Sequence, residues 1–182
     1  MKSLPIYINE YIIKNKLDKP IDSEHTYKYL PKTKEELAEN IEELVDRDIY
    51  DFNCIDTSKI TDMSELFYNK EDINIDVSKW NVSNVTNMAH TFFNCENFDC
   101  DLSNWNVSKV ENMSSMFYGC KLFNCDLSKW DVSNVFDMTE MFTNCNKFNC
   151  DLSSWDISKV YRRVGIFHNC TSLKNKPIWY QE

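Results

Sequence analysis

Glycine is scarce in this chain: only Gly119 and Gly165 occur among its 182 residues, alongside four prolines. The turns of the fold must therefore be built from other residue types. The scarcity also excludes a glycine-rich loop that would bind phosphate groups.

Positive charge and long apolar segments are also in short supply. The chain has 20 Lys and Arg residues against 29 Asp and Glu, a net charge of −9 and a pI of about 4.9. Proteins that bind nucleic acids need a basic patch, so we expect no nucleic-acid partner. No apolar stretch approaches the roughly 18–20 residues of a membrane span.

The first residues lack the features of an export signal. The segment MKSLPIYINEYIIKNKLDKP contains no apolar run of the kind that a secretory signal requires. The first cysteine is Cys54, so no lipid-attachment cysteine lies near the start. We therefore expect a cytoplasmic or virion-associated protein rather than one on the cell surface.

No combination of residues indicates catalysis or a bound metal. His25, His90 and His168 share no motif spacing, and no C-x₂-C pair or Cys/His cluster is present. We therefore predict that the protein is not an enzyme and has no catalytic residues, no metal site and no cofactor.

What the sequence does contain is a repeat. One pattern recurs every 25 residues without insertion, and its most regular positions are a tryptophan, a methionine and a phenylalanine. They stand at Trp80, Trp105, Trp130 and Trp155; at Met63, Met88, Met113 and Met138; and at Phe67, Phe92, Phe117, Phe142 and Phe167. A fixed period of this length predicts a solenoid, in which stacked neighbours create the core.

Each repeat resembles a leucine-rich-repeat unit of α/β class. The segment from Leu102 to Val110 reads L-x-x-W-x-V-x-x-V, and the alternation of Trp105 and Val107 indicates a short strand. Asp or Asn precedes each repeat methionine, where the N-cap of a short helical turn belongs. We therefore predict an α/β repeat solenoid with a parallel sheet on one face and helical turns on the other.

Two further sets of positions follow from this register. The turns should end at asparagine or glycine, which tolerate the left-handed conformation. These residues are Asn69, Asn94, Gly119, Asn144 and Asn169. The core of one coil should consist of Leu102, Trp105, Val107, Val110, Met113, Met116, Phe117, Cys120 and Phe123, with equivalents in the other coils.

Four segments divide the chain. Residues 1–31 are predicted to be a leader or connector, 32–50 a capping helix, 51–172 about five repeats, and 173–182 a C-terminal cap. The helix prediction depends on a capping box at Thr33 and Glu36 and on an apolar face. That face comprises Leu37, Ile41, Leu44 and Val45. A helix that binds a partner is the alternative interpretation.

Seven of the eight cysteines fall into two repeat columns. The columns are Cys95, Cys120, Cys145 and Cys170, and Cys100, Cys125 and Cys150. Column membership indicates packing, because a free cysteine behaves as a small buried hydrophobe. We expect reduced, buried thiols, and disulfides between coils are the alternative.

A column of aspartates has two interpretations. It consists of Asp76, Asp101, Asp126 and Asp151. Clustered carboxylates could bind Ca²⁺. We favour an Asp-Leu-Ser turn in which the Asp side chain accepts a hydrogen bond from the backbone two residues on.

The phrases NVSNVTNMAHTFFNC and DLSKWDVSNVFDMTEMF resemble the BspA-like family of 25–26-residue repeats. KTKEELAENIEELVDRD followed by CIDTSKITDMSELF resembles the segment that often precedes such an array. The family occurs in bacterial surface proteins, mycoplasma-type lipoproteins and some phage or viral proteins. The resemblance covers roughly residues 55–172. It implies a leucine-rich-repeat-like solenoid with a binding or surface role and no catalytic residues.

The expected function is a non-enzymatic binding module for a protein or glycan, and the alternative is a structural repeat in a larger assembly such as a phage or viral particle. The outward polar residues of the expected strand are the first candidates for partner binding. They are Asn81, Ser83, Asn104, Asn106, Ser108, Lys129, Asp131, Ser133 and Asp156. The alternative contact surface is aromatic and consists of Tyr68, Phe93 and Tyr118.

Overall fold

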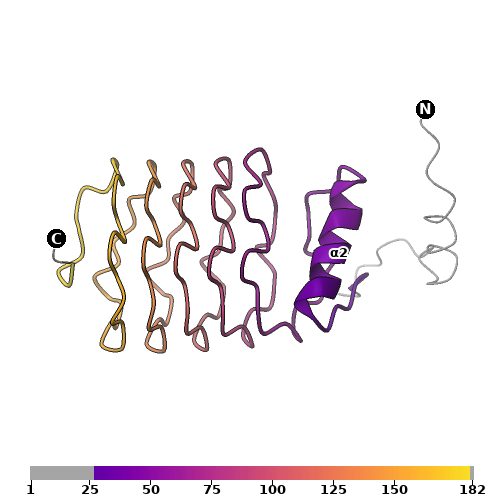
Figure 1. The fold of residues 1–182 in the computed structure, drawn as a ribbon, viewed down its shortest axis with the longest axis horizontal. Coiled ribbons are helices and arrows are strands. Elements are labelled where there is room, and N and C mark those ends of the chain that lie inside the picture. Colours follow the sequence, from indigo (N-terminus) through magenta and orange to yellow (C-terminus); the bar gives the residue numbers. More distant parts are fainter. Residues whose placement is uncertain (1–26, 181–182) are drawn as a thin grey trace, which may run out of the picture.

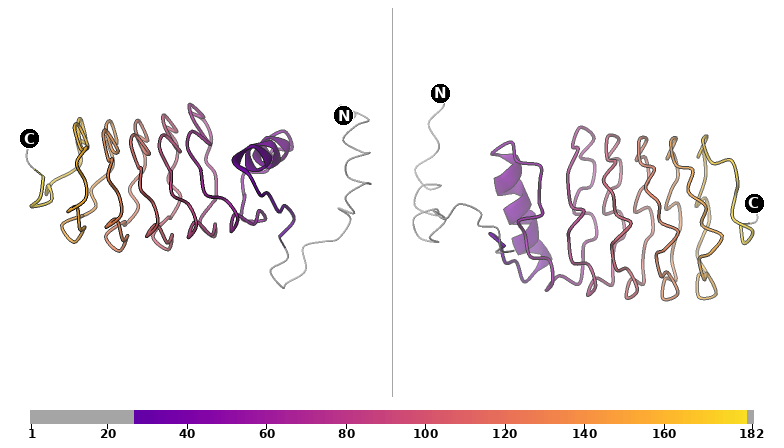
Figure 2. Two further views of the ribbon diagram at one scale, coloured as in Figure 1. Left: turned by 60° about the horizontal axis from the view of Figure 1, so that its bottom comes forward. Right: turned by 180° about the vertical axis from the view of Figure 1, so that it is seen from behind.

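The computed structural model describes residues 27–180, so most of the predicted leader lies outside the described residues. Within that range the chain forms one helix, α2 (Lys34–Val45), and then winds through a row of stacked loops, each one repeat long (Figure 1). We call these loops coils. Two further views show the same row, with α2 across one end and the C-terminal segment at the other (Figure 2).

The predicted fold class, an α/β repeat solenoid of leucine-rich-repeat-like coils, is wrong. Residues 27–180 contain no β-strand, only isolated parallel bridges, and no helix besides α2. The strand expected around Trp105 is a series of tight turns. The amide of Trp105 donates to the carbonyl of Leu102 over 3.0 Å, and the amide of Val110 donates to Val107 over 2.8 Å. Hydrogen bonds between residues three apart bend the chain, whereas a strand stays extended.

The short helical turn expected after each repeat methionine is absent for a different reason. The amide of Met113 donates to the carbonyl of Asp137 in the next coil, over 2.9 Å. The amide of Ser115 donates in the same way to Thr139, over 2.8 Å. These amides therefore bond between coils and not within a helical turn. Ser115 also has φ of 50°, in the left-handed region, where a right-handed helix cannot continue.

The largest set of backbone hydrogen bonds between coils follows one rule, in which four alternate amides of a coil donate to four carbonyls of the next. We call the four donors an amide row. In the last such pair of coils the donors are Met138, Glu140, Phe142 and Asn144, and the acceptors are Arg162, Val164, Ile166 and His168, at 2.8–2.9 Å. Since each such bond contributes about 0.5–1.5 kcal/mol net, the row sets the register between neighbouring coils.

Left-handed residues make this row possible. The predicted asparagine and glycine column is confirmed, with φ between 55° and 73° at Asn69, Asn94, Gly119, Asn144 and Asn169. A second left-handed column, which the sequence did not predict, lies four residues earlier in each coil. It consists of Glu65, His90, Ser115, Glu140 and Gly165. The two columns turn the backbone so that alternate amides face the next coil.

The apolar columns fill the inside of the coils, as predicted. The nine core positions of the coil from Leu102 to Phe123 are between 0% and 4% exposed. Phenylalanines of the repeat column stack from coil to coil, with ring centroids 5.6 Å apart for both Phe92–Phe117 and Phe117–Phe142. The Trp105 indole N–H is buried and donates to a carbonyl of the preceding coil over 3.1 Å. No polar atom of that ring is therefore left without a partner.

Helix α2 covers the first coil through its apolar face, where Leu37, Ile41 and Leu44 are buried. The predicted capping residue is confirmed, since Thr33 Oγ1 accepts from the Glu36 amide over 3.2 Å. The Glu36 carboxylate accepts from the backbone amide of Lys32 over 2.6 Å. A capping box would use the amide of the next residue, Thr33. The helix is also shorter than the segment 32–50 in which it was predicted.

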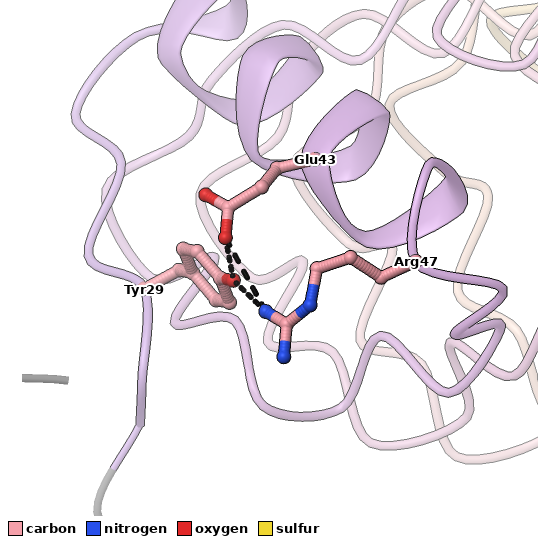
Figure 3. Close-up of polar contacts among 3 residues, drawn as sticks. All are labelled: Tyr29, Glu43 and Arg47. Atoms are coloured by element: carbon pink, nitrogen blue, oxygen red, sulfur yellow. Dashed lines mark hydrogen bonds and ion pairs between the residues drawn. The ribbon is translucent and has the colours of Figure 1, made fainter. Parts of the chain in front are cut away.

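A polar cluster ties the other end of α2 to the segment before it (Figure 3). The Tyr29 hydroxyl donates to Glu43 over 2.8 Å, and Arg47 donates to the same carboxylate over 3.3 Å. Burial, followed by the hydrogen bond to Glu43, raises the pKa of Tyr29. The backbone of Tyr29 also pairs with Ile55. The cluster thus links the helix to the coil that it covers.

The asparagine column offers a test of this backbone. Asn94 Nδ2 donates to Asn69 Oδ1 over 2.9 Å, but Gly119 interrupts the ladder in the next coil. A Cβ atom built on Gly119 would lie 2.4 Å from Asn94 Oδ1, a side-chain atom that can rotate away. Asparagine also tolerates the left-handed conformation, so Gly119→Asn should change the free energy of unfolding by less than about 0.5 kcal/mol.

Gly119→Val is the matched control, because a β-branched residue is strained at the φ of +73° found there. It should lower the free energy of unfolding, measured in urea, by about 2 kcal/mol. Equal losses in the two variants would contradict this account of the column.

Candidate interaction surfaces

The nine residues predicted to bind a partner lie at corresponding positions of four neighbouring coils, and we call them the polar face. They are Asn81, Ser83, Asn104, Asn106, Ser108, Lys129, Asp131, Ser133 and Asp156. Most of them form Asx turns. Asn106 Oδ1 accepts from the Ser108 amide over 3.2 Å and from the Ser108 hydroxyl over 2.7 Å. The same acceptor role recurs at Asn81, Asp131 and Asp156.

Asn104 and Lys129 are the exceptions among the nine. Both are exposed, and neither side chain makes a hydrogen bond within the part of the chain that the structure describes. At Asp131, in contrast, the hydrogen bonds from the side chain and backbone of Ser133 lower the pKa of the carboxyl. The turn residues thus direct acceptor oxygens at their own backbone, whereas Asn104 and Lys129 keep their whole polar groups for a partner.

The aspartate column forms the predicted Asx turns. Asp76, Asp101, Asp126 and Asp151 each accept from the amide of the serine two residues on, at 2.9–3.0 Å. Among residues 27–180 no group of three His, Cys, Asp or Glu side chains is arranged to hold a metal ion.

One cysteine column lies against these aspartates, a contact that the sequence did not predict. The Cys125 thiol donates to Asp101 over 3.4 Å, and Cys150 donates to Asp126 over the same distance. Burial raises the pKa of Cys125 to about 12 and that of Cys150 to about 11, so both thiols keep their protons at neutral pH. The regular offset of 24 residues between Asp and Cys is the feature of the sequence from which this contact could have been predicted. A shallow depression beside the column is lined by Asp99, Cys100, Asp101, Ser103, Asn104, Asn124, Cys125, Asp126 and Lys129.

The other cysteine column lies inside the coils. Each thiol donates to a carbonyl of the preceding coil, for example Cys120 to Phe92 over 3.0 Å and Cys145 to Phe117 over 2.9 Å. All eight cysteines are free thiols, and burial raises the pKa of Cys95 to about 12. The thiols act as hydrogen-bond donors in the core and not as nucleophiles.

Three aromatic side chains form a stack on the outside of successive coils. Tyr68 and Phe93 lie 4.7 Å apart between ring centroids, and Phe93 and Tyr118 lie 4.6 Å apart, both pairs within 10° of parallel. His90 contacts Phe93 at 5.6 Å. Tyr68 is 42% exposed, and Phe93 and Tyr118 are half-buried. We call Tyr68, Phe93 and Tyr118 the aromatic ladder. It ends at Thr143, a small residue that is buried in the following coil.

A family model described as "Mycoplasma protein of unknown function, DUF285" matches residues 35–135 and 101–181. The chain belongs to this family. The two matches overlap, as expected of a repeat that fits the same pattern in more than one register. No curated protein and no solved structure matches the chain.

The family description assigns no function, so the chemistry of a DUF285 chain has to come from its own residues. In residues 27–180 of this one, no helix is long and apolar enough to cross a membrane. The polar face and the aromatic ladder are the two surfaces that can be tested.

The thiols of this DUF285 protein can be tested by alkylation. At neutral pH the folded protein should leave Cys95, Cys120 and Cys145 unlabelled, because they are buried and burial raises their pKa. Labelling should become complete in denaturant, as read by mass spectrometry. Reductant should leave the Tm unchanged. A fall of several degrees would instead indicate disulfides between coils, which typically contribute about 2–4 kcal/mol.

The Asx turns predict how stability depends on pH. Six aspartates in these turns have lowered pKa values, namely Asp76, Asp101, Asp126, Asp131, Asp151 and Asp156. Their contribution is fully present above the unfolded-state value of about 3.9 and is lost as the pH falls through the folded-state values. The free energy of unfolding should therefore drop below about pH 4.

The double variant Asp101→Asn/Asp126→Asn provides the comparison. Asparagine keeps the oxygen that accepts the serine amide, so the variant should fold, but it cannot take up protons in this range. Urea midpoints at about pH 6 and about pH 3 should differ less for the variant than for the parent chain. An unchanged difference would rule out these two carboxylates as a source of the pH dependence.

Proposed function

We propose that this chain is a non-enzymatic repeat module that binds a partner protein or glycan, and that the aromatic ladder is its main contact surface. The observation that supports the proposal is the partial exposure of three stacked rings on successive coils. Tyrosine is enriched among the residues that dominate binding energy at interfaces. The hydroxyl groups of Tyr68 and Tyr118 add polar contacts at the edge of an apolar strip.

A protein fits the ladder better than a glycan does. Phe93 has a neighbouring ring on each of its two faces, Tyr68 on one and Tyr118 on the other. A sugar ring stacks on an open aromatic face, whereas at Phe93, the central ring, a partner can reach only the edge. The apolar side chains of a protein can pack against such edges.

The polar face is the second candidate surface, through Asn104 and Lys129. These two side chains are exposed and are not held in Asx turns. Asn106 and Asp131 are poorer candidates for a binding test than the sequence suggested. Replacing either one would remove an acceptor that the fold uses, so a loss of binding could reflect a local loss of structure.

The relationship to the BspA-like repeats of bacterial surface proteins belongs to the same proposal and is supported by the motif resemblance. A structural repeat within a larger assembly, such as a phage or viral particle, is the second candidate function. The unequal ends of the coil row favour it, because α2 covers one end and no helix covers the other within residues 27–180. A free cytoplasmic or virion-associated state would suit either function.

The two surfaces can be separated with a pair of variants. Tyr68→Ser/Phe93→Ser/Tyr118→Ser removes the ladder, and Asn104→Ala/Lys129→Ala removes the free polar groups of the other face. Immobilised chains would be probed with lysates and with a glycan array. We expect the affinity of the ladder variant for a partner protein to fall at least about thirtyfold, since hot-spot residues contribute about 2 kcal/mol or more.

The polar variant should keep that partner. The reverse result, with binding lost in the polar variant alone, would move the site to the polar face. Retention only on the glycan array would replace the protein partner by a sugar. A chain that binds nothing in either assay would favour the structural alternative. Circular dichroism of both variants verifies that they remain folded.

A further inference from the structure

The last coil has an amide row that no residue of the described range 27–180 covers. By the rule of the preceding coils, its four donors are the backbone amides of Arg163, Gly165, Phe167 and Asn169. None of the four has a hydrogen-bond partner among residues 27–180, although the equivalent amides one coil earlier are all bonded at 2.8–2.9 Å. Four donors at alternate positions resemble the free edge of a sheet, which is a template for another chain.

The C-terminal segment covers only the other half of this end. Trp179 continues the tryptophan column, and its indole N–H donates to Leu152 over 3.0 Å. Pro177 is buried, and Tyr180 contacts the Phe167 ring edge-on at 5.3 Å. The apolar core is thus closed, while Tyr161 and Val164 beside the amide row stay 70% and 79% exposed.

The charge of this end is opposite to that of the chain. Residues 157–180 contain no Asp or Glu, although the whole protein has a net charge of −9. They contain five basic residues, Lys159, Arg162, Arg163, Lys174 and Lys176. Arg163 is exposed and makes no ion pair with a described residue. Both the amides and the side chains of this end therefore favour a ligand rich in oxygen acceptors and negative charge.

We propose that this edge docks an extended, acidic segment of a partner protein, which pairs its alternate backbone carbonyls with the free amide row. We call the edge, defined by Arg163, Gly165, Phe167 and Asn169, the docking edge. An extended chain directs every second carbonyl to one side, which matches donors placed at alternate residues. Val164 and Tyr161 supply apolar contacts next to the pairing, and Arg163 attracts the acidic side chains.

A second copy of this chain fits the docking edge poorly. Helix α2 lies across the opposite end of the row of coils (Figure 1). The carbonyls of a helix bond within the helix itself, so α2 offers no row of acceptors to another copy. The proposed site is also separate from the aromatic ladder, so the two proposals can fail independently.

The chain supplies its own probe. A synthetic peptide of residues 136–144, FDMTEMFTN, contains the four residues whose carbonyls take up the amide row of the preceding coil: Asp137, Thr139, Met141 and Thr143. It is acidic through Asp137 and Glu140. A scrambled peptide of the same composition keeps the charge but changes the pattern of side chains beside the paired carbonyls. Binding of both to the full chain would be measured by fluorescence anisotropy, and amide exchange by NMR.

We expect the native peptide to bind and to slow hydrogen exchange at Arg163, Gly165, Phe167 and Asn169, while the amides of Met138 and Glu140 stay unchanged because they are already bonded. Arg163→Glu should weaken binding about tenfold, as loss of a charged contact does at many interfaces. Lys79→Glu, the same charge change in the first coils, should have no effect.

Four outcomes would overturn the proposal. The peptide could fail to bind at millimolar concentration, or the scrambled peptide could bind equally well. Binding could also leave the exchange of the four amides unchanged, which would indicate attraction by charge alone. Protection of these amides in the absence of peptide, together with a dimer in analytical ultracentrifugation, would assign the edge to a second copy.

Discussion

Backbone hydrogen bonds between coils hold this fold in register, and they require each coil to aim four amides in one direction. The backbone meets that requirement with two left-handed residues per coil, four positions apart. A residue other than glycine loses about 1–2 kcal/mol in this conformation. The amide row offsets that cost with about 0.5–1.5 kcal/mol per bond, and the stacked phenylalanines and tryptophans bury apolar surface behind it.

The sequence predicted the parts of this structure that depend on residue type. Phenylalanine, tryptophan and cysteine columns are buried because apolar side chains avoid water, and the Asp-Leu-Ser turn forms because a short carboxylate reaches its own backbone. Asn94 is left-handed because asparagine tolerates that conformation. The α/β class was wrong because spacing alone does not distinguish a short strand from consecutive turns. The left-handed conformation of Glu65 and Glu140 could not be predicted, since glutamate has no preference for the left-handed region.

The surfaces were predicted less well than the core, for a physical reason. Asn106 and Asp131 look like free polar groups in a sequence, but the structure shows that their oxygens accept hydrogen bonds from the following serines. Asn104 and Lys129 have the same exposure without that role. The stacking of Phe93 between two other rings could be anticipated from its repeat position. The free amides at Gly165 and Asn169 could not be anticipated. The sequence does not show which backbone amides of a coil donate to the next coil, and so it does not show which amides stay free where no further coil follows.

The different closures of the two ends have a consequence for the length of the chain. Helix α2 lies across one end of the row of coils, and Trp179 packs at the other end, so neither closure depends on how many coils lie between them. If one complete repeat were removed or added, the contacts between neighbouring coils would be of the same kind as those already present. Such a protein can change its length in whole steps while its ends stay the same. Duplication or loss of a single repeat would therefore change the distance between α2 and the docking edge by the spacing of one coil.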